Sequence, residues 1–185
     1  MYKDILKSIG PGPKERVPDE IYVVVEIPKG SRNKYEIDDE TGAVFLDRVL
    51  FSPFVYPADY GIIPCTLCED GDPLDALVLV DIPNYPGTVI RARPVALLEM
   101  EDEEGYDVKV LAVPHEKIDP RFKEIRDLKD VPSHVLEEIK HFFEHYKDLE
   151  PNKWTRVKGW RDKEAAKREI LKAIKLYMEK VGHEG

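Results

Sequence analysis

The chain has 185 residues, enough for one domain with a substantial buried core. Its formal net charge of −9 disfavours a nucleic-acid backbone or an anionic membrane surface as the main partner. No apolar run approaches the roughly 18 residues of a membrane span, and the N-terminus lacks the apolar core of a secretory signal. We therefore expect a cytoplasmic protein.

Short strands separated by turns are predicted for the first two thirds of the chain. Residues 1–20 are rich in Gly and Pro and are predicted to form an N-terminal arm. Alternating or continuous apolar residues predict strands over 21–27, 34–37, 43–51, 76–80, part of 88–100 and 106–113. Residues 39–42 and 102–105 are predicted turns, 53–64 an irregular segment, and Pro94 indicates an edge strand or a bulge.

Two helices are predicted towards the C-terminus. Residues 133–146 show apolar side chains at helical spacing, and a second helix is predicted to begin after the cap Asp162 and to end before Gly182. Several short strands followed by two late helices favour an α+β, mainly β fold, a closed β-barrel with the helices packed outside. We expect residues 1–185 to form a single domain.

The most informative segment is the acidic loop that precedes the strand 76–80. Asp70, Asp72 and Asp75 fall within six residues, with Gly71 and Pro73 between them. Like charges at the edge of a core repel one another unless a cation lies between them, and several carboxylates suit Mg²⁺. The alternative is a solvated acidic turn. An EF-hand is excluded because the later ligand positions and the closing Glu are missing.

Cations share strand faces with acids elsewhere in the chain. Strand alternation places Lys34 beside Glu36, and Asp107 beside Lys109, while Arg48 extends an apolar row. Any one such pair is explained equally well as a surface ion pair of little energy. Together, beside the acidic loop, they predict a polar cavity that binds cations and a polyanion such as phosphate.

The motif Asp70-Gly71-Asp72-Pro73-Leu74-Asp75 resembles the D-x-D-P-x-D pattern of family I soluble inorganic pyrophosphatases of the archaeal and bacterial type. The resemblance extends over nearly all the chain, including residues 21–28, 34–38, 141–150 and 158–160. It implies Mg²⁺-dependent hydrolysis of pyrophosphate to two orthophosphates. It also implies a five-stranded OB-like barrel with two helices, and a homohexamer.

The same resemblance assigns roles to individual residues. It implies that metal ions are bound or supported by Asp70, Asp72, Asp75, Asp102, Asp107, Glu26 and Glu36. Among these, Asp72 is implied to be the general base. Phosphate oxygens are implied to be held by Lys34, Arg48, Lys109, Tyr146 and Lys147. Tyr56 and Tyr60 are implied to complete the hydrogen-bond network around the attacking water.

Other features are less specific. Asp59 stands where bacterial members often have Asn, and we expect it to add a charge near the site. His141 and His145 share a helix face, which suits either a zinc site or, as the resemblance favours, a contact between subunits. The pair Cys65 and Cys68 is interpreted as semi-buried apolar residues.

Two rival functions remain open at this point. One is an OB-fold module that binds single-stranded nucleic acid, which needs a basic groove with stacking aromatics. The other is a structural protein stabilised by Ca²⁺ or Mg²⁺. The acids and the net charge disfavour the first. The cations around those acids are left unexplained by the second.

Overall fold

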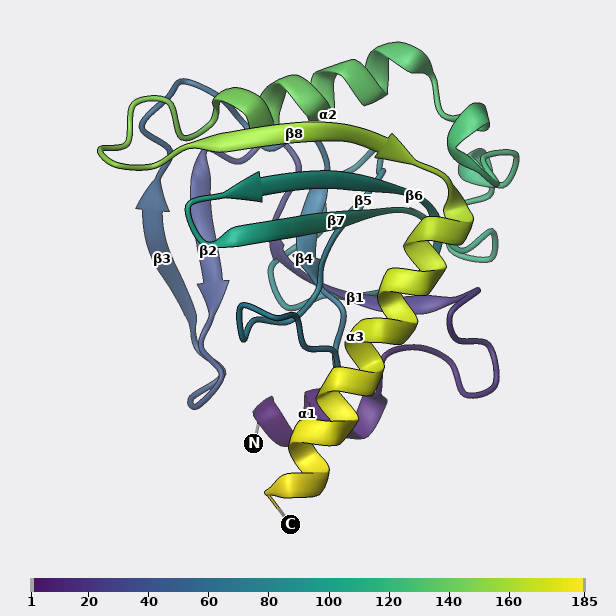
Figure 1. The fold of residues 1–185 in the computed structure, drawn as a ribbon. Helices are drawn as coiled ribbons and strands as arrows, with labels where there is room; N and C mark the ends of the chain where they lie inside the picture. The colour runs from purple at the N-terminus through teal and green to yellow at the C-terminus, as the bar shows by residue number, and fades with distance from the viewer. Residues whose placement is uncertain (1, 185) are drawn as a thin grey trace.

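The computed structural model describes residues 2–184 and is mainly β, with three α-helices among those residues (Figure 1). The helices are α1 (Tyr2–Ile9), α2 (Ser133–His145) and α3 (Lys163–His183). The strands are β1 (Ile21–Ile27), β2 (Asn33–Ile37), β3 (Val44–Val49), β4 (Asp59–Ile62), β5 (Asp75–Val78), β6 (Val89–Asp102), β7 (Gly105–Pro114) and β8 (Thr155–Arg161). None of the described helices is long and apolar enough to cross a membrane.

Five strands form a ring in the order β1-β4-β5-β7-β6, and β6 pairs again with β1 to close it. The closing register joins Ile21 to Ala92 and Val24 to Val89. Strand β8 adds to the outer side of β6, and β2 and β3 form a separate hairpin. Figure 1 shows this hairpin standing to one side of the ring, where it forms a wall of its own.

Alternate residues of the ring strands feed two apolar clusters, because side chains on a strand point to opposite faces. Ala76 and Val78 of β5 belong to the first cluster, which α3 covers with Ala166, Ile170 and Ala173. Leu77 of β5 belongs to the second cluster, which α2 covers with Ile139, Phe142 and Phe143. The two helices thus cover different parts of the ring, and the polar ends of the strands are left for a site.

The predicted strands and the two late helices are confirmed, with shifts of one to a few residues at their ends. Asp162 caps α3 as predicted, since its Oδ1 accepts a hydrogen bond from the Ala165 amide at 3.0 Å. Pro94 lies beside a bulge in the pairing of β6 with β7, and β6 is a central strand rather than an edge.

Three local predictions were wrong, and one strand was not predicted. The arm contains helix α1, the segment 53–64 contains strand β4, and Gly182 lies inside α3 rather than beyond it, while residues 155–161 form the unpredicted strand β8. Both missed strands are stabilised mainly by their partners. β4 has only four residues and is held between β1 and β5, and the polar β8 is held by β6.

Gly61 of β4 is required by the closeness of β1. A Cβ at this position would lie 1.9 Å from the Val24 carbonyl oxygen, so any larger residue would push the two strands apart. This contact fixes the path of β4, and β4 carries the neighbouring Tyr60.

Candidate active site

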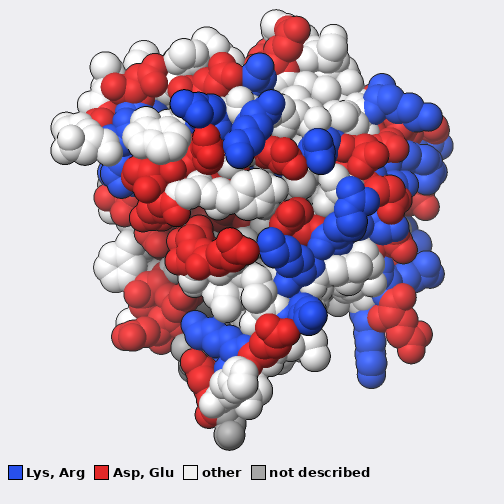
Figure 2. All heavy atoms as spheres, viewed as in Figure 1, with Lys and Arg blue, Asp and Glu red and all other residues white. Residues whose placement is uncertain are grey.

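A cavity of about 900 Å³ lies between the β2–β3 hairpin, the acidic loop 67–75, the β6–β7 turn and the segment that follows α2. Every residue predicted for the site lines this cavity, with the exception of Tyr56. The lining therefore includes Glu26, Lys34, Glu36, Arg48, Tyr60, Asp70, Asp72, Asp75, Asp102, Asp107, Lys109, Tyr146 and Lys147. In Figure 2, carboxylate groups gather over the centre and left of this face, with Lys and Arg groups above them and to the right.

The acidic loop forms an exposed group of carboxylates. One oxygen from each of Asp70, Asp72 and Glu104 lies within 4.8 Å of the others. The loop is held by the Cys68 amide, which donates to the Asp72 carbonyl oxygen at 2.8 Å, and by Asp70 Oδ1, which accepts from the Asp72 amide at 2.9 Å. Burial and the neighbouring charges of Asp70 and Asp75 raise the pKa of Asp72.

Lys109 lies at the centre of the cavity floor and is almost fully buried. Its Nζ lies 2.7 Å from Asp75 Oδ2 and 3.0 Å from Asp107 Oδ2, and it donates to the Tyr60 hydroxyl at 2.9 Å. Burial acts to lower the pKa of the ammonium, but Asp107 and Asp75 outweigh burial and hold this pKa well above its usual range. Lys109 therefore remains charged, and it neutralises part of the acidic floor.

Glu26 extends the acidic floor from β1. One of its oxygens accepts a hydrogen bond from the Ile37 amide at 2.9 Å, which ties β1 to the hairpin. The pKa of Glu26 is raised to about 7, mainly by burial, with the charges of Asp75 and Glu36 acting in the same direction and the Ile37 hydrogen bond acting against them. Burial and Asp75 also raise the pKa of Asp107, against the lowering effect of Lys109.

The donor set of this cavity suits a hard divalent cation. All of its acidic groups are carboxylates, which are the ligands that Mg²⁺ prefers. Burial is the main cause of the raised pKa values of Glu26, Asp72 and Asp107, and the repulsion of neighbouring carboxylates adds to it. A bound cation would relieve this repulsion.

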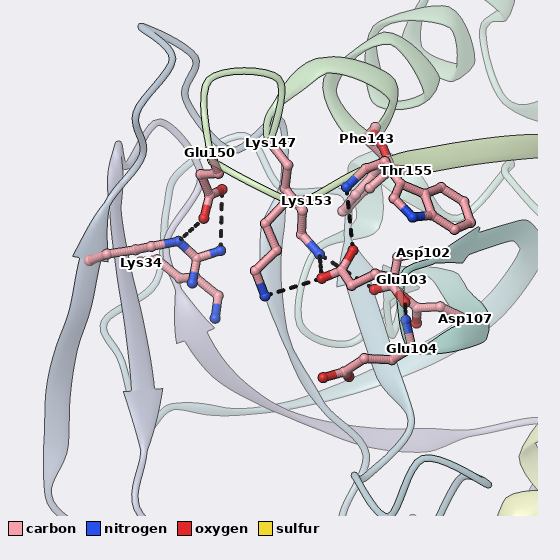
Figure 3. Close-up of polar contacts among 12 residues, drawn as sticks. Lys34, Asp102, Glu103, Glu104, Asp107, Phe143, Lys147, Glu150, Lys153 and Thr155 are labelled. Carbon is pink, nitrogen blue, oxygen red and sulfur yellow. Dashed lines mark hydrogen bonds and ion pairs between the residues drawn. The ribbon is translucent and has the colours of Figure 1, made fainter.

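Lys and Arg side chains form two rims of the cavity. Asp47 Oδ2 lies 3.1 Å from Lys34 Nζ and 2.6 Å from Arg48 Nη1, so one carboxylate holds two predicted phosphate ligands on adjacent strands. On the other side, Lys147 Nζ lies 3.4 Å from Asp102 Oδ2 and 3.6 Å from Glu103 Oε1. Figure 3 shows Lys34 and Lys147 on opposite sides of the same space.

Two predicted features lie elsewhere than expected. Tyr56 is buried behind the cavity, with its ring 5.4 Å from Tyr60 and 4.7 Å from Phe142. Burial raises the pKa of its hydroxyl, as does Tyr146, while Lys109 and Arg48 lower it, so the hydroxyl lies within electrostatic reach of the site.

Asp59 was expected to add a charge near the site, and the structure places it outside the cavity lining. It is fully buried and accepts hydrogen bonds from the Lys29 amide at 2.9 Å and from Asn84 Nδ2 at 2.8 Å. Its carboxylate therefore joins two loops on another side of the ring.

Sequence reasoning missed Glu104, Asp47 and Glu150 as parts of the site. Glu104 could have been predicted from the sequence, because it belongs to the acidic turn that contains Asp102. Asp47 follows from its position next to Arg48. Glu150 had no local signal, because it meets Arg48 across 102 positions of the chain.

A floor of carboxylates, cationic rims and a donor set for a divalent cation are typical of enzymes that transfer or hydrolyse phosphoryl groups. The inorganic pyrophosphatase family matches residues 23–178. The chain is 52% identical to the inorganic pyrophosphatase of Aquifex pyrophilus over 92% of this chain and 96% of that protein. It is 55% identical to that of Saccharolobus solfataricus over 88% and 95%.

Solved structures agree with these sequence comparisons. The inorganic pyrophosphatase of Thermus thermophilus superposes with a TM-score of 0.88 at 51% identity, covering 94% of this chain and 98% of that chain. The enzyme of Helicobacter pylori gives a TM-score of 0.85 at 53% identity, over 86% and 94%. The chain therefore belongs to the inorganic pyrophosphatase family, and its assignment from sequence as a pyrophosphate hydrolase is confirmed.

Proposed function

We propose that the chain hydrolyses pyrophosphate to two orthophosphates in a reaction that depends on Mg²⁺ and takes place in the 900 Å³ cavity. The observation that carries the proposal is the meeting of an acidic floor and two cationic rims in one space. The acids suit a divalent cation, and the cations suit the oxygens of a polyanion. A nucleic-acid groove would lack such a floor.

The acids of the cavity divide into two groups in this proposal. The first group would hold Mg²⁺ directly and comprises Asp70, Asp75, Asp102 and Asp107. The second would act through metal-bound water and comprises Asp72, Glu26 and Glu36. When bound, Mg²⁺ supplies charge neutralisation of the phosphate oxygens and acidifies water. The ammonium of Lys109 neutralises part of the charge of Asp75 and Asp107. It therefore reduces the repulsion between these carboxylates when few metal ions are bound.

The remaining residues bind, orient and move a proton. Lys34, Arg48, Lys147 and Tyr146 contact the phosphate oxygens from the rims, and Lys109 does so from the floor. Asp72, at the exposed mouth, accepts a proton from the water that attacks phosphorus. The bond from that phosphorus to the bridging oxygen breaks, and the rim cations stabilise the charge that the leaving phosphate acquires. Tyr60 packs against Tyr56, and its hydroxyl, which accepts a hydrogen bond from Lys109, joins the hydrogen-bond network.

The proposal is tested by following phosphate release from pyrophosphate with and without Mg²⁺. We expect no significant turnover after treatment with EDTA, recovery on addition of Mg²⁺, and inhibition by Ca²⁺, whose looser coordination places the attacking water poorly. Full activity in EDTA, or undiminished turnover with Ca²⁺ alone, would contradict the metal dependence. A gel shift with single-stranded nucleic acid is expected to be negative.

The proposal extends to the form of the protein. We infer that the five-stranded ring is an OB-like closed barrel, that residues 1–185 are one domain, and that the protein acts in the cytoplasm as a homohexamer. Exposed apolar side chains on the β2–β3 hairpin and on the loop after β5 support assembly. Phe45, which also lines the cavity, is 56% exposed, and Ile82 and Tyr85 are 71% and 85% exposed.

A further inference from the structure

Arg48 is held from behind by a buried carboxylate that does not belong to the cavity lining. Arg48 Nε lies 2.9 Å from Glu150 Oε1 as an ion pair, and Nη2 donates to Glu150 Oε2 at 3.5 Å. The Glu150 side chain is only 7% exposed. Burial alone would lower the pKa of the guanidinium, but Glu150 and Asp47 outweigh burial and raise this pKa.

Glu150 belongs to a short segment, residues 147–154, that touches both rims of the cavity. At the start of the segment Lys147 pairs with Asp102. Near its other end, Lys153 Nζ lies 3.1 Å from Glu103 Oε1. Between them Glu150 reaches to β3. Figure 3 shows Lys147, Glu150 and Lys153 projecting from this segment, with Lys34 on one side and Asp102 and Glu103 on the other.

The hairpin is not part of the ring, and Glu150 adds a tie on β3 to the one that Glu26 makes with Ile37 at the end of β2. β2 and β3 pair only with each other among the described strands. Asp47 holds Arg48 within the hairpin itself, so it cannot fix the distance from the hairpin to the acidic floor. Glu150 connects the guanidinium to the body of the protein through Nε and Nη2, whereas Nη1 pairs with Asp47, and Arg48 itself lines the cavity.

We propose that Glu150 is a positioning residue, which sets the place of the Arg48 guanidinium relative to the acidic floor and so determines how pyrophosphate is bound and oriented. The inference rests on the proposed contact of Arg48 with phosphate. Orientation of this kind is costly to lose, since a displacement of about 1 Å lowers rates by up to about 10²-fold.

Three physical roles of Glu150 give different kinetic results. If its charge merely weakens the local positive potential, then Glu150→Gln makes the cavity more positive and lowers KM for an anion. If it only stabilises the fold, Glu150→Gln lowers the melting temperature and leaves kcat and KM of the folded enzyme unchanged. If it positions Arg48, kcat/KM falls although the local charge has become more favourable for the substrate.

The experiment compares Glu150→Gln, Glu150→Asp and wild type by steady-state kinetics with Mg²⁺-pyrophosphate and by thermal melting. We expect kcat/KM of Glu150→Gln to fall about 10-fold to 100-fold. Glu150→Asp keeps the charge but shortens the arm, and we expect it to recover part of the loss. Inorganic phosphate should also bind more weakly to Glu150→Gln than to wild type. Titration measures this binding without any catalytic turnover.

Glu20 provides a matched control. It is buried to the same degree, 7% exposed against 8% for Glu150, and its Oε1 accepts a hydrogen bond from Arg91 Nε at 2.6 Å, away from the cavity. We expect Glu20→Gln to lower the melting temperature and to leave kcat and KM unchanged. A similar kinetic loss in this control would overturn the inference, because it would reflect the breaking of any buried Arg–Glu pair.

A double-mutant cycle with Arg48→Lys separates this inference from the proposed function. Lysine lacks the planar fork that pairs with a carboxylate, so Glu150→Gln should cost little further kcat/KM in the Arg48→Lys background. If both single variants lose activity and their effects multiply, Glu150 does not act through Arg48 and the inference fails. If Arg48→Lys alone leaves kcat and KM unchanged, the proposed phosphate contact fails, and the inference fails with it.

Discussion

Asp72 and Asp75 are three residues apart in one loop, yet they have different surroundings. Asp75 forms an ion pair with Lys109 at 2.7 Å, whereas Asp72 lies at the mouth with Asp70 and Glu104. We expect Asp72→Asn to lower kcat by about 10²–10⁴, the usual effect of losing a general base. We expect Asp75→Asn mainly to raise the Mg²⁺ concentration needed for half-maximal activity.

Both quantities come from one set of assays, in which kcat and the Mg²⁺ dependence are measured for each variant. The melting temperature of each variant is the control for folding, particularly for Asp75→Asn, which also releases Lys109. Equal losses of metal affinity in the two variants would contradict the division of roles between Asp72 and Asp75.

The buried Asp59 predicts a pH dependence of stability. Burial raises its pKa in the folded protein against the hydrogen bonds from Lys29 and Asn84. A carboxyl with a raised folded pKa binds its proton more readily in the folded chain. Its contribution to stability is therefore lost as the pH rises from the unfolded pKa, about 4, through the folded pKa. Asp59→Asn removes this loss.

We therefore expect Asp59→Asn to become more stable relative to wild type, with a larger free energy of unfolding, as the pH is raised above about 4. Urea unfolding at a series of pH values measures it. Asp38→Asn is the control with the opposite sign, since hydrogen bonds from Thr41 lower the pKa of Asp38 and its stabilisation is lost as the pH falls. Parallel curves for Asp59→Asn and wild type would refute the assignment.

The acidic loop and the pairs Lys34–Glu36 and Asp107–Lys109 were predictable because they are local patterns, whereas most other site residues were assigned through the family resemblance. Glu150 was not predictable, because its contact with Arg48 arises only when the segment after α2 reaches the hairpin. Asp59 illustrates the opposite failure. A position beside Tyr60 suggested proximity to the site, but neighbouring residues of a strand point to opposite faces.

At the scale of elements, the sequence predicts best those strands and helices that carry their own apolar pattern. β1 and α2 are examples. β4 and β8 are short or polar and exist because β1, β5 and β6 supply their hydrogen bonds. Helix α1 was hidden by the Gly and Pro residues that follow it, which indicated a turn-rich arm for the whole segment. Closure of the ring depends on pairing between distant strands, which no local pattern contains.

The contact between β4 and β1 predicts a strong effect of Gly61→Ala. The added Cβ would meet the Val24 carbonyl oxygen at 1.9 Å, and a backbone atom cannot move aside without displacing the strand. We expect a loss of about 1–3 kcal/mol or more in the free energy of unfolding. We also expect a lower kcat, because Tyr60 moves with the strand.

Gly182→Ala provides the comparison for Gly61→Ala. Gly182 lies in α3 with nothing within 4 Å of the added Cβ, so this variant should be neutral or stabilised by up to about 1 kcal/mol. Chemical denaturation of both variants measures the difference. A Gly61→Ala protein as stable as wild type would show that β1 and β4 are less closely constrained than described.

At the scale of the whole molecule, two histidines of α2 predict how the proposed hexamer responds to acid. The His141 and His145 rings lie 4.6 Å apart, and His145 Nδ1 lies 2.8 Å from Asp148 Oδ2. His141 instead packs against Phe54, with ring centroids 5.6 Å apart. His145 thus has the acidic partner that the sequence suggested, and a protonated His141 would face a second imidazolium.

We expect a hexamer at pH 8 that loosens towards pH 5, because histidines become charged over this range and each charge is repeated at every equivalent contact. Light scattering on wild type, His141→Gln and His145→Gln measures it. The His141→Gln hexamer should resist acid more than the His145→Gln hexamer does, because His141 is the histidine that has no carboxylate paired with it among the described residues, whereas His145 pairs with Asp148. A monomer at every pH would rule out assembly, and unchanged dissociation in both variants would exclude the histidines.

The closure of the ring also bears on how the protein is made. During synthesis β1 emerges early, but its partner in β6 lies some 70 residues later, so the first strand has an unpaired edge until then. The residues 147–154 and helix α3 emerge last. A nascent chain released before Lys147 would therefore carry the whole acidic floor without the cations and the covering helix of its last segment. Such a truncated product would be inactive, and the part of β6 that pairs with β8 would be left as an open edge that favours aggregation.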